Sequence, residues 1–346
     1  MSKTGAMSLV LGLAVTFLAV FGIEALANDY VIAVICFVGL NIILAVSLNI
    51  TNGLGGLFSL GHPAFMAIGG YVAAIMTFHP GRKASFLPDL PAIIASQQWP
   101  LFPSVLLGGA VAAIVAAIFG YPILRLKGHY LAVGTLALII IVKNLIVNAD
   151  GLTRGALGIN GLRGLTNLWW VAGWTVVVVL FAFRLKFSLI GRRILAMREA
   201  ELAAASSGVY VAGFKSLVFV IGAFFAGVAG GLWAHLVSVI TPDSFSLSTA
   251  FFLVVMVVIG GTGSITGSVL GAIIFTVLTE IIRPVETQVG VYGISQVITG
   301  LVLLAVLLRR PIGLFGSQEP EALLRLFTNT DQRKEAVQPS KQEQSA

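Results

Sequence analysis

Charged side chains are scarce in this chain. Asp, Glu, Lys and Arg make up only 10% of its 346 residues, while 58% are hydrophobic. A typical soluble domain carries about 25% charged residues, so this chain must place most of its surface in lipid. The net charge of +7 does not indicate nucleic-acid binding, because the basic residues stand in the gaps between apolar runs. We therefore expect membrane lipid as a partner and no nucleic acid.

Cysteine and the common catalytic motifs are also lacking. The single cysteine, Cys36, lies inside an apolar run, which excludes an intrachain disulfide framework and a cysteine-based metal site. No lysine follows a glycine, so there is no Walker A sequence, and neither HExxH nor GxSxG occurs. We therefore predict no enzymatic activity, no ATPase site, no metal and no cofactor in this chain.

Long apolar runs fill most of the sequence. A helix needs about 20 apolar residues to span a bilayer, and fewer where it is broken and shielded by protein. The predicted fold class is an all-α polytopic membrane protein with about ten transmembrane or partly re-entrant helices. The predicted segments are 7–27, 30–49, 63–79, 102–120, 130–148, 168–183, 215–239, 249–262, 267–283 and 290–308.

One polar stretch between these segments is strongly basic. Residues 184–215 contain six Lys or Arg and two Glu, a bias that marks a cytoplasmic loop. If each segment crosses once, 15 Lys or Arg fall on the side of this loop and five on the other, and both termini face the cytoplasm. The centre of the loop, residues 201–208, is helix-prone and rich in small residues. A helix with so little bulk fits a groove on a cytoplasmic partner.

Three parts of the chain are distinguished on this basis. Residues 1–29 form the N-terminus and the first transmembrane helix. Residues 30–315 form the transmembrane domain, which contains the cytoplasmic loop 184–214. The tail, 316–346, is polar and charged, a composition typical of disorder.

Glycine is abundant, at 39 residues, and marks two kinds of feature. Small residues at four-residue intervals, as at Gly263, Gly267 and Gly271, predict close helix–helix packing in lipid. In addition, two glycine-rich breaks, 51–62 and 259–267, interrupt the apolar pattern once in each half of the chain. Paired interruptions often mark discontinuous helices near a transport path, but a re-entrant turn that only shapes the fold explains them equally well. The candidate path or hinge residues are Gly53, Gly55, Gly56, Gly61, His62, Gly260, Gly261, Gly263 and Gly267.

Six groups of short motifs occur in an order that resembles one family. This family comprises the integral-membrane permeases of branched-chain amino-acid ABC importers, of the kind that pairs with a second, related permease. The resemblance covers roughly 30–315. The motifs occupy residues 59–65 with 69–71, 125–132, 158–161, 191–193 with 201–208, 242–245, and 260–267.

The resemblance implies an ABC importer permease fold and a set of partners. Glu201, Ala203, Ala204 and Gly208 fall on the family's coupling element, which docks on the ATP-binding subunit. The implied partners are a second homologous permease, two cytoplasmic ATP-binding subunits and a periplasmic substrate-binding protein. The implied location is the bacterial inner membrane, and the implied solute is a branched-chain, hydrophobic amino acid.

Other functions stay open at this point. Members of the same broad family also carry urea, short amides or aromatic acids. The chain departs from the family at His129 and in the outer loop 153–161, which leaves the solute undecided. An ion-coupled secondary carrier would need a mid-membrane carboxylate, whereas Glu24 and Glu280 fall near the outer ends of their segments. An intramembrane enzyme would need a nucleophile–base pair, and the sequence indicates none.

Overall fold

In lipid, every backbone polar group must be satisfied within the protein, so the long apolar runs form helices. The computed structural model describes residues 18, 20–126, 128–289, 293–309, 313–316 and 319. Nine helices correspond one to one to the second to tenth predicted segments, and most of segment 7–27 lies outside the described residues. They are α2 (Asp29–Asn49), α3 (His62–Thr77), α6 (Leu101–Ile123), α7 (His129–Asn148), α9 (Leu168–Lys186), α12 (Val211–Val237), α13 (Leu247–Gly260), α14 (Ile265–Val289) and α15 (Ile294–Arg309).

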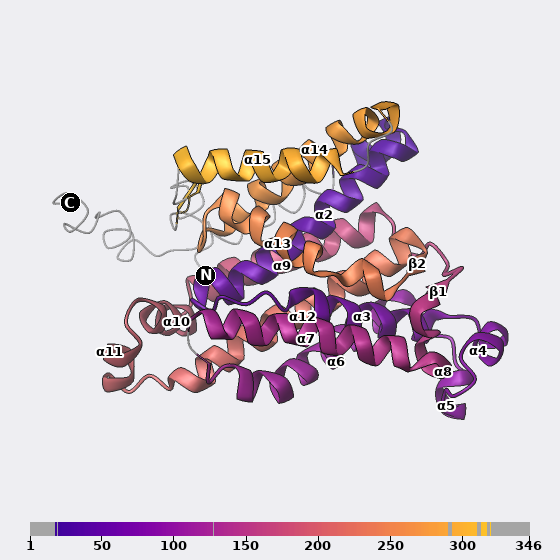
Figure 1. The fold of residues 1–346 in the computed structure, drawn as a ribbon, viewed down its shortest axis with the longest axis horizontal. Coiled ribbons are helices and arrows are strands. Elements are labelled where there is room, and N and C mark those ends of the chain that lie inside the picture. The colour runs from indigo at the N-terminus through magenta and orange to yellow at the C-terminus, as the bar shows by residue number, and fades with distance from the viewer. Residues whose placement is uncertain are drawn as a thin grey trace.

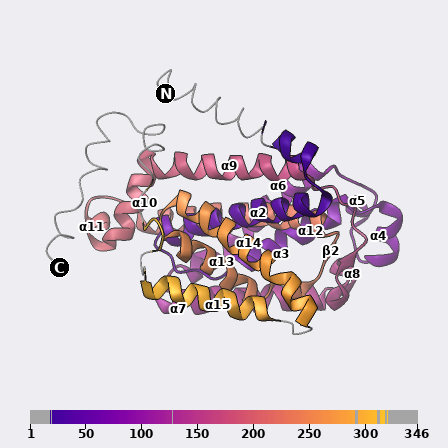
Figure 2. The ribbon, with the colours of Figure 1, turned by 90° about the horizontal axis from the view of Figure 1, so that it is seen from above.

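Length and composition make this a multi-pass membrane protein. Among the described residues, six helices are long and apolar enough to cross a bilayer, and α3 and α13 are shorter apolar helices. Figure 2 places α9 along one flank and α15 along the other, with α2, α12 and α14 between them. The predicted all-α, polytopic fold class is confirmed.

The polar connections gather at two opposite ends of the bundle (Figure 1). Helices α10 (Leu189–Glu199) and α11 (Glu201–Ser206) project at one end. Short elements occupy the other end, where the sequence had predicted only loops. These elements are α4 (Pro80–Phe86), α5 (Ala92–Ala95), α8 (Asp150–Thr153), and the paired strands β1 (Ile159–Asn160) and β2 (Val239–Ile240). We call the first end the inner end and the second the outer end. That the inner end faces the cytoplasm stays a prediction.

Glycines let the backbones of α3, α6 and α12 touch. A methyl group added at Gly69 would overlap the backbone of Gly227, and one added at Gly108 would lie 2.5 Å from the carbonyl oxygen of Gly69. Helices α13 and α14 approach in the same way, since Gly267 packs directly on Gly260. Of the predicted series, Gly267 and Gly271 serve the packing of α14 on α13, whereas Gly263 lies in the turn before α14.

The outer end has one buried cation. Lys83, in α4, has no exposed surface, and its ammonium group donates to the carbonyl oxygens of Ile94 and Gln97, 2.9 and 2.6 Å away. Burial lowers the pKa of this lysine. Lys83 thus ties α4 to α5 and to the residues just after it.

Candidate functional site

The first glycine break lies at the inner end of α2. The helix ends in a five-residue π-helical turn, Ile50–Leu54, and the chain then runs without helix until α3 begins at His62. Space is limiting here, because a methyl group on Gly53 would come within 2.5 Å of the backbone nitrogen of Gly263. Gly56 adopts a positive φ of 65°, which disfavours side chains with a Cβ atom.

The second break separates α13 from α14. Gly261 and Gly263 have φ values of 110° and 95°, a region that only glycine enters readily. Helix α14 starts two residues later, at Ile265. The turn therefore depends on its glycines for backbone conformation as well as for close packing.

One side chain joins the two breaks. The Asn49 Oδ1 atom accepts a hydrogen bond from the backbone nitrogen of Gly263, and its Nδ2 atom donates to the carbonyl oxygen of Ser264, both at 2.8 Å. Asn49 is only 1% exposed, so both bonds lie away from water. The structure thus brings together the candidates Gly53 and Gly263, which lie 210 residues apart in sequence.

The inner loop contacts this junction directly. Arg198, in the last turn of α10, donates from Nη1 to the carbonyl oxygen of Gly53 at 2.8 Å. Its aliphatic stem packs on Gly56, where an added methyl group would lie 2.9 Å away. Arg198, Asn52 and Thr262 line a pocket of about 230 Å³, and its apolar lining comes from α13, the end of α2 and Phe58.

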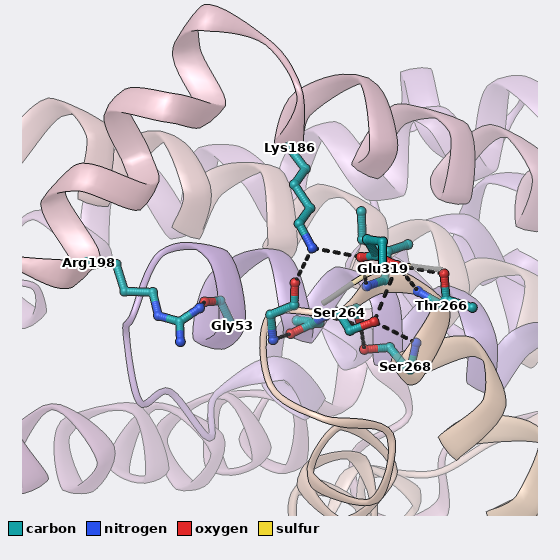
Figure 3. A network of polar contacts seen from close by, with 11 residues as sticks. Gly53, Lys186, Arg198, Ser264, Thr266, Ser268 and Glu319 are labelled. Atoms are coloured by element: carbon teal, nitrogen blue, oxygen red, sulfur yellow. Dashed lines mark hydrogen bonds and ion pairs between the residues drawn. The ribbon is translucent and has the colours of Figure 1, made fainter. Parts of the chain in front are cut away.

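A second basic residue reaches the other side of the junction (Figure 3). Lys186, the last residue of α9, donates from Nζ to the carbonyl oxygen of Gly263 at 2.6 Å and to the Glu319 carboxylate at 2.7 Å. The charge count had placed Lys186 in a cytoplasmic loop; the structure instead buries its side chain to 9% exposure. Glu319 falls in the tail for which composition predicts disorder, yet its side chain is 1% exposed.

Helix α11 carries the four predicted coupling residues. Glu201 pairs with Lys215 of α12 at 2.8 Å, and Ala203 is exposed. Ala204 is 6% exposed and faces the protein, so it holds the helix in place and does not face a partner. Gly208, at φ 82°, ends the helix in a Schellman arrangement, with its own amide bonded to the carbonyl of Ala205.

Sequence reasoning missed an exposed leucine on α11. Leu202 is 85% exposed, and α11 is not among the helices long and apolar enough to cross a membrane. A large apolar side chain on a polar loop was the available signal. The exposed residues that follow it on α11 are small, so Leu202 is the large apolar side chain on the exposed surface of this helix.

His62 and Gly61 lie at the start of α3. The His62 ring is 1% exposed and borders Gly222 of α12 together with Thr51. Among the described residues neither ring nitrogen makes a hydrogen bond of good geometry, and the backbone of Ser47 is the polar group beside the ring. Gly61 packs against Thr135, whose hydroxyl accepts the amide of the preceding Leu60 at 3.0 Å. Gly61 occupies the N-cap position of α3, and His62 is the first residue of the helix.

The remaining candidates fall at the same junction. Gly55 packs on Val218 of α12, and Gly260 packs on Gly267 of α14. Within the described part of the chain, no three His, Cys, Asp or Glu residues gather into a possible metal centre.

Broken apolar helices that meet beside a polar arm are typical of membrane-embedded transport subunits. A family model described as "Branched-chain amino acid transport system / permease component" matches residues 30–307, and the chain belongs to that family. Proteins of this family are permease components and carry no ATPase site, so the chain is a transport subunit and not an enzyme.

Curated relatives agree with the family. The high-affinity branched-chain amino acid transport system permease protein LivM of Salmonella typhimurium is 30% identical over 82% of this chain and 69% of its own length, and the LivM protein of Escherichia coli gives the same figures. The corresponding LivH protein of Escherichia coli is 24% identical over 81% of this chain and 92% of its own length. No solved structure matches the chain.

Proposed function

We propose that this protein forms half of the translocation pathway of an ATP-driven importer for branched-chain, hydrophobic amino acids. It works in the bacterial inner membrane with both termini in the cytoplasm. Residues 1–29 add a first helix to the transmembrane domain 30–315, and the 184–214 loop serves the partners. These are a second homologous permease, two ATP-binding subunits and a periplasmic binding protein.

The observation that carries the proposal is the contact between Arg198 and Gly53. Helix α11 docks on an ATP-binding subunit through Leu202, Ala203 and the turn at Gly208. Movement of that subunit displaces α10, and Arg198 passes the displacement to the first break. Asn49 then carries it to the second break through its two hydrogen bonds.

The two breaks supply the hinge of the pathway. Non-helical backbone at membrane depth is tolerated where protein buries it or where it lines a cavity, and the pocket beside Asn52 and Arg198 supports the second role. His62 adds to this argument, because its buried ring has no well-formed hydrogen bond among the described residues, and a buried polar group without one costs about 1–3 kcal/mol. We infer that its imidazole gains a partner, from water or solute, when the pathway opens.

The outer end supports delivery by a soluble receptor. A pocket of about 250 Å³ there is lined by His79, Arg82 and Arg163, and none of the described residues that line it is acidic. Arg82 donates one hydrogen bond, to the carbonyl oxygen of Gly161 at 3.1 Å. This pocket suits an acidic side chain of a receptor, because complementary charge guides docking.

The test is uptake by the reconstituted complex of both permeases, both ATP-binding subunits and the receptor in proteoliposomes. Labelled leucine, isoleucine and valine should enter only with ATP and receptor. Excess urea, acetamide or benzoate should not compete. Competition by one of these three, with no uptake of the amino acids, assigns the alternative solute class and overturns the proposed one. Uptake by this chain alone, driven by an ion gradient, overturns the importer assignment itself.

A further inference from the structure

The carboxylate of Glu319 is held by an unusually complete set of donors. It accepts hydrogen bonds from the backbone nitrogens of Ile265 and Thr266 at 2.6 and 3.2 Å, and from the hydroxyls of Thr266 and Ser264 at 2.6 and 3.3 Å. The Lys186 ammonium adds an ion pair at 2.7 Å. Both carboxylate oxygens are thus used, and the side chain is 1% exposed (Figure 3).

This position is the N-terminus of α14. The first amides of a helix have no partner within the helix, and the helix dipole favours a negative charge there. Glu319 supplies both a hydrogen-bond acceptor and a charge from 54 residues further along the chain. It therefore caps α14 as an N-cap residue would, but from a distant segment.

The segment just before Glu319 caps the other side of the same break. The amides of Leu314 and Phe315 donate to the carbonyl oxygens of Ile259 and Gly260, at 2.9 and 3.1 Å. Those carbonyls belong to the last turn of α13, where helices leave acceptors unused. Residues 313–316 and Glu319, here called the C-terminal strap, thus hold the end of α13 and the start of α14 together.

The strap also reaches the inner loop. Lys186 bonds both Glu319 and the carbonyl of Gly263, and the amide of Gly263 bonds Asn49. Lys186 lies three residues before α10 starts at Leu189. A displacement of α10 therefore pulls on the same lysine that anchors the strap.

We propose that Glu319 is a positioning residue for transport: through Lys186 and the α14 N-terminus, it holds the second break in its resting arrangement until the coupling helix moves. This rests on the proposed function. In Glu319→Gln the Lys186 ammonium loses its ion-pair partner, and one of the two acceptor oxygens becomes an NH2 group that cannot accept a hydrogen bond. The second break can then change conformation without movement of the ATP-binding subunits, and ATP hydrolysis is no longer coupled to transport.

Two readouts on the reconstituted complex test this. The first is hydrogen–deuterium exchange of the peptide containing Ile265 and Thr266, whose amides are protected by Glu319. In Glu319→Gln their exchange should quicken about tenfold. Glu335→Gln makes the same chemical change elsewhere in the tail and should leave exchange unchanged. Unchanged exchange in Glu319→Gln overturns the strap.

The second readout is the number of solute molecules moved per ATP hydrolysed. Glu319→Gln should raise receptor-independent ATP hydrolysis and lower this ratio, while Glu319→Asp should restore part of it. Lys186→Met combined with Glu319→Gln should be no worse than Lys186→Met alone, because both act through one contact. Additive losses, or an unchanged ratio in Glu319→Gln, overturn the positioning role.

The exchange experiment separates this inference from the proposed function. If the complex fails to import branched-chain amino acids but exchange still quickens in Glu319→Gln, the strap holds and the solute assignment falls. Protection of peptides from α3 and α12 in the same data reports whether each variant is folded.

Discussion

The guanidinium group of Arg198 donates to the carbonyl oxygen of Gly53, 145 residues earlier in the chain and 2.8 Å away. One residue belongs to the inner loop and the other to the broken end of a membrane helix. The bond is charge-assisted, and such bonds are stronger than neutral ones. This hydrogen bond connects the inner loop directly to the first glycine break.

Arg198→Ala should lower ATP-dependent uptake about tenfold while the subunit still inserts and assembles. The physical reason is that the loop then moves without displacing Gly53. Arg193→Ala is the matched control, since Arg193 lies on the same helix and is exposed. Equal uptake by the two variants in proteoliposomes would contradict the role given to Arg198.

Gly208 offers a test of backbone conformation at the end of α11. Nothing lies within 4 Å of a methyl group built there, so space is available, but φ is 82°. Gly208→Val should therefore abolish most coupling, whereas Gly208→Asn should retain it, because Asn tolerates the left-handed region and Val does not. Solute-stimulated ATPase activity of the complex is the measurement. Similar loss in both variants would point to size, and not φ, as the constraint.

Leu202 should be the energetic centre of the contact with an ATP-binding subunit. Leu202→Asp replaces an exposed apolar side chain with a charge and should weaken subunit association, as seen by pull-down of the purified membrane subunits. Ser206→Asp is the control, because it adds the same charge on the same exposed helix. If only Ser206→Asp releases the ATP-binding subunit, the contact lies nearer the C-terminal end of the same face of α11 and does not depend on Leu202.

Asn49 should matter for stability as well as for transport. Asn49→Leu leaves the amide of Gly263 and the carbonyl of Ser264 without partners in a buried site, and each unsatisfied group costs about 1–3 kcal/mol. We expect a lower midpoint of thermal unfolding in detergent. Asn148→Leu, at the exposed end of α7, should change the midpoint little. A midpoint for Asn49→Leu equal to that of the unmodified protein would remove Asn49 from the junction.

Arg163 should govern docking at the outer end. Reversing its charge with Arg163→Glu should weaken binding of the soluble receptor, and the difference from the unmodified protein should shrink at high salt, which screens exposed charges. Arg283→Glu makes the same change on α14 and serves as the control. Receptor affinity that falls equally in both variants would indicate a general effect of net charge and not this pocket.

The helices were predictable because long apolar runs permit few structures in lipid. Segments such as 130–148 and 267–283 correspond to α7 and α14 within a few residues, except at the outer end of α14, which continues to Val289. The outer end was not predictable in detail. The pairing of Ile159 with Ile240 joins residues 81 positions apart, and nothing local in either short stretch specifies the other.

The candidate site was predictable by position and not by connection. Glycine content located both breaks, but the bridge through Asn49 depends on how two distant helices pack. Leu202 is visible in the sequence as an apolar residue in a polar loop, but the sequence does not show that its side chain is exposed. Nothing in the sequence around Glu319 indicates that it is buried. A glutamate in a charged tail is buried only where hydrogen-bond donors from other segments surround its carboxylate.

The contact among Gly69, Gly108 and Gly227 has a mechanical consequence. Where three backbones touch with no side chains between them, there is no compliant layer in which they can slide. Helices α3, α6 and α12 must therefore move as one rigid unit. Conformational changes during a transport cycle then occur at the ends of these helices. A single methyl group at any of the three glycines would push these helices apart and displace the segments attached to their ends.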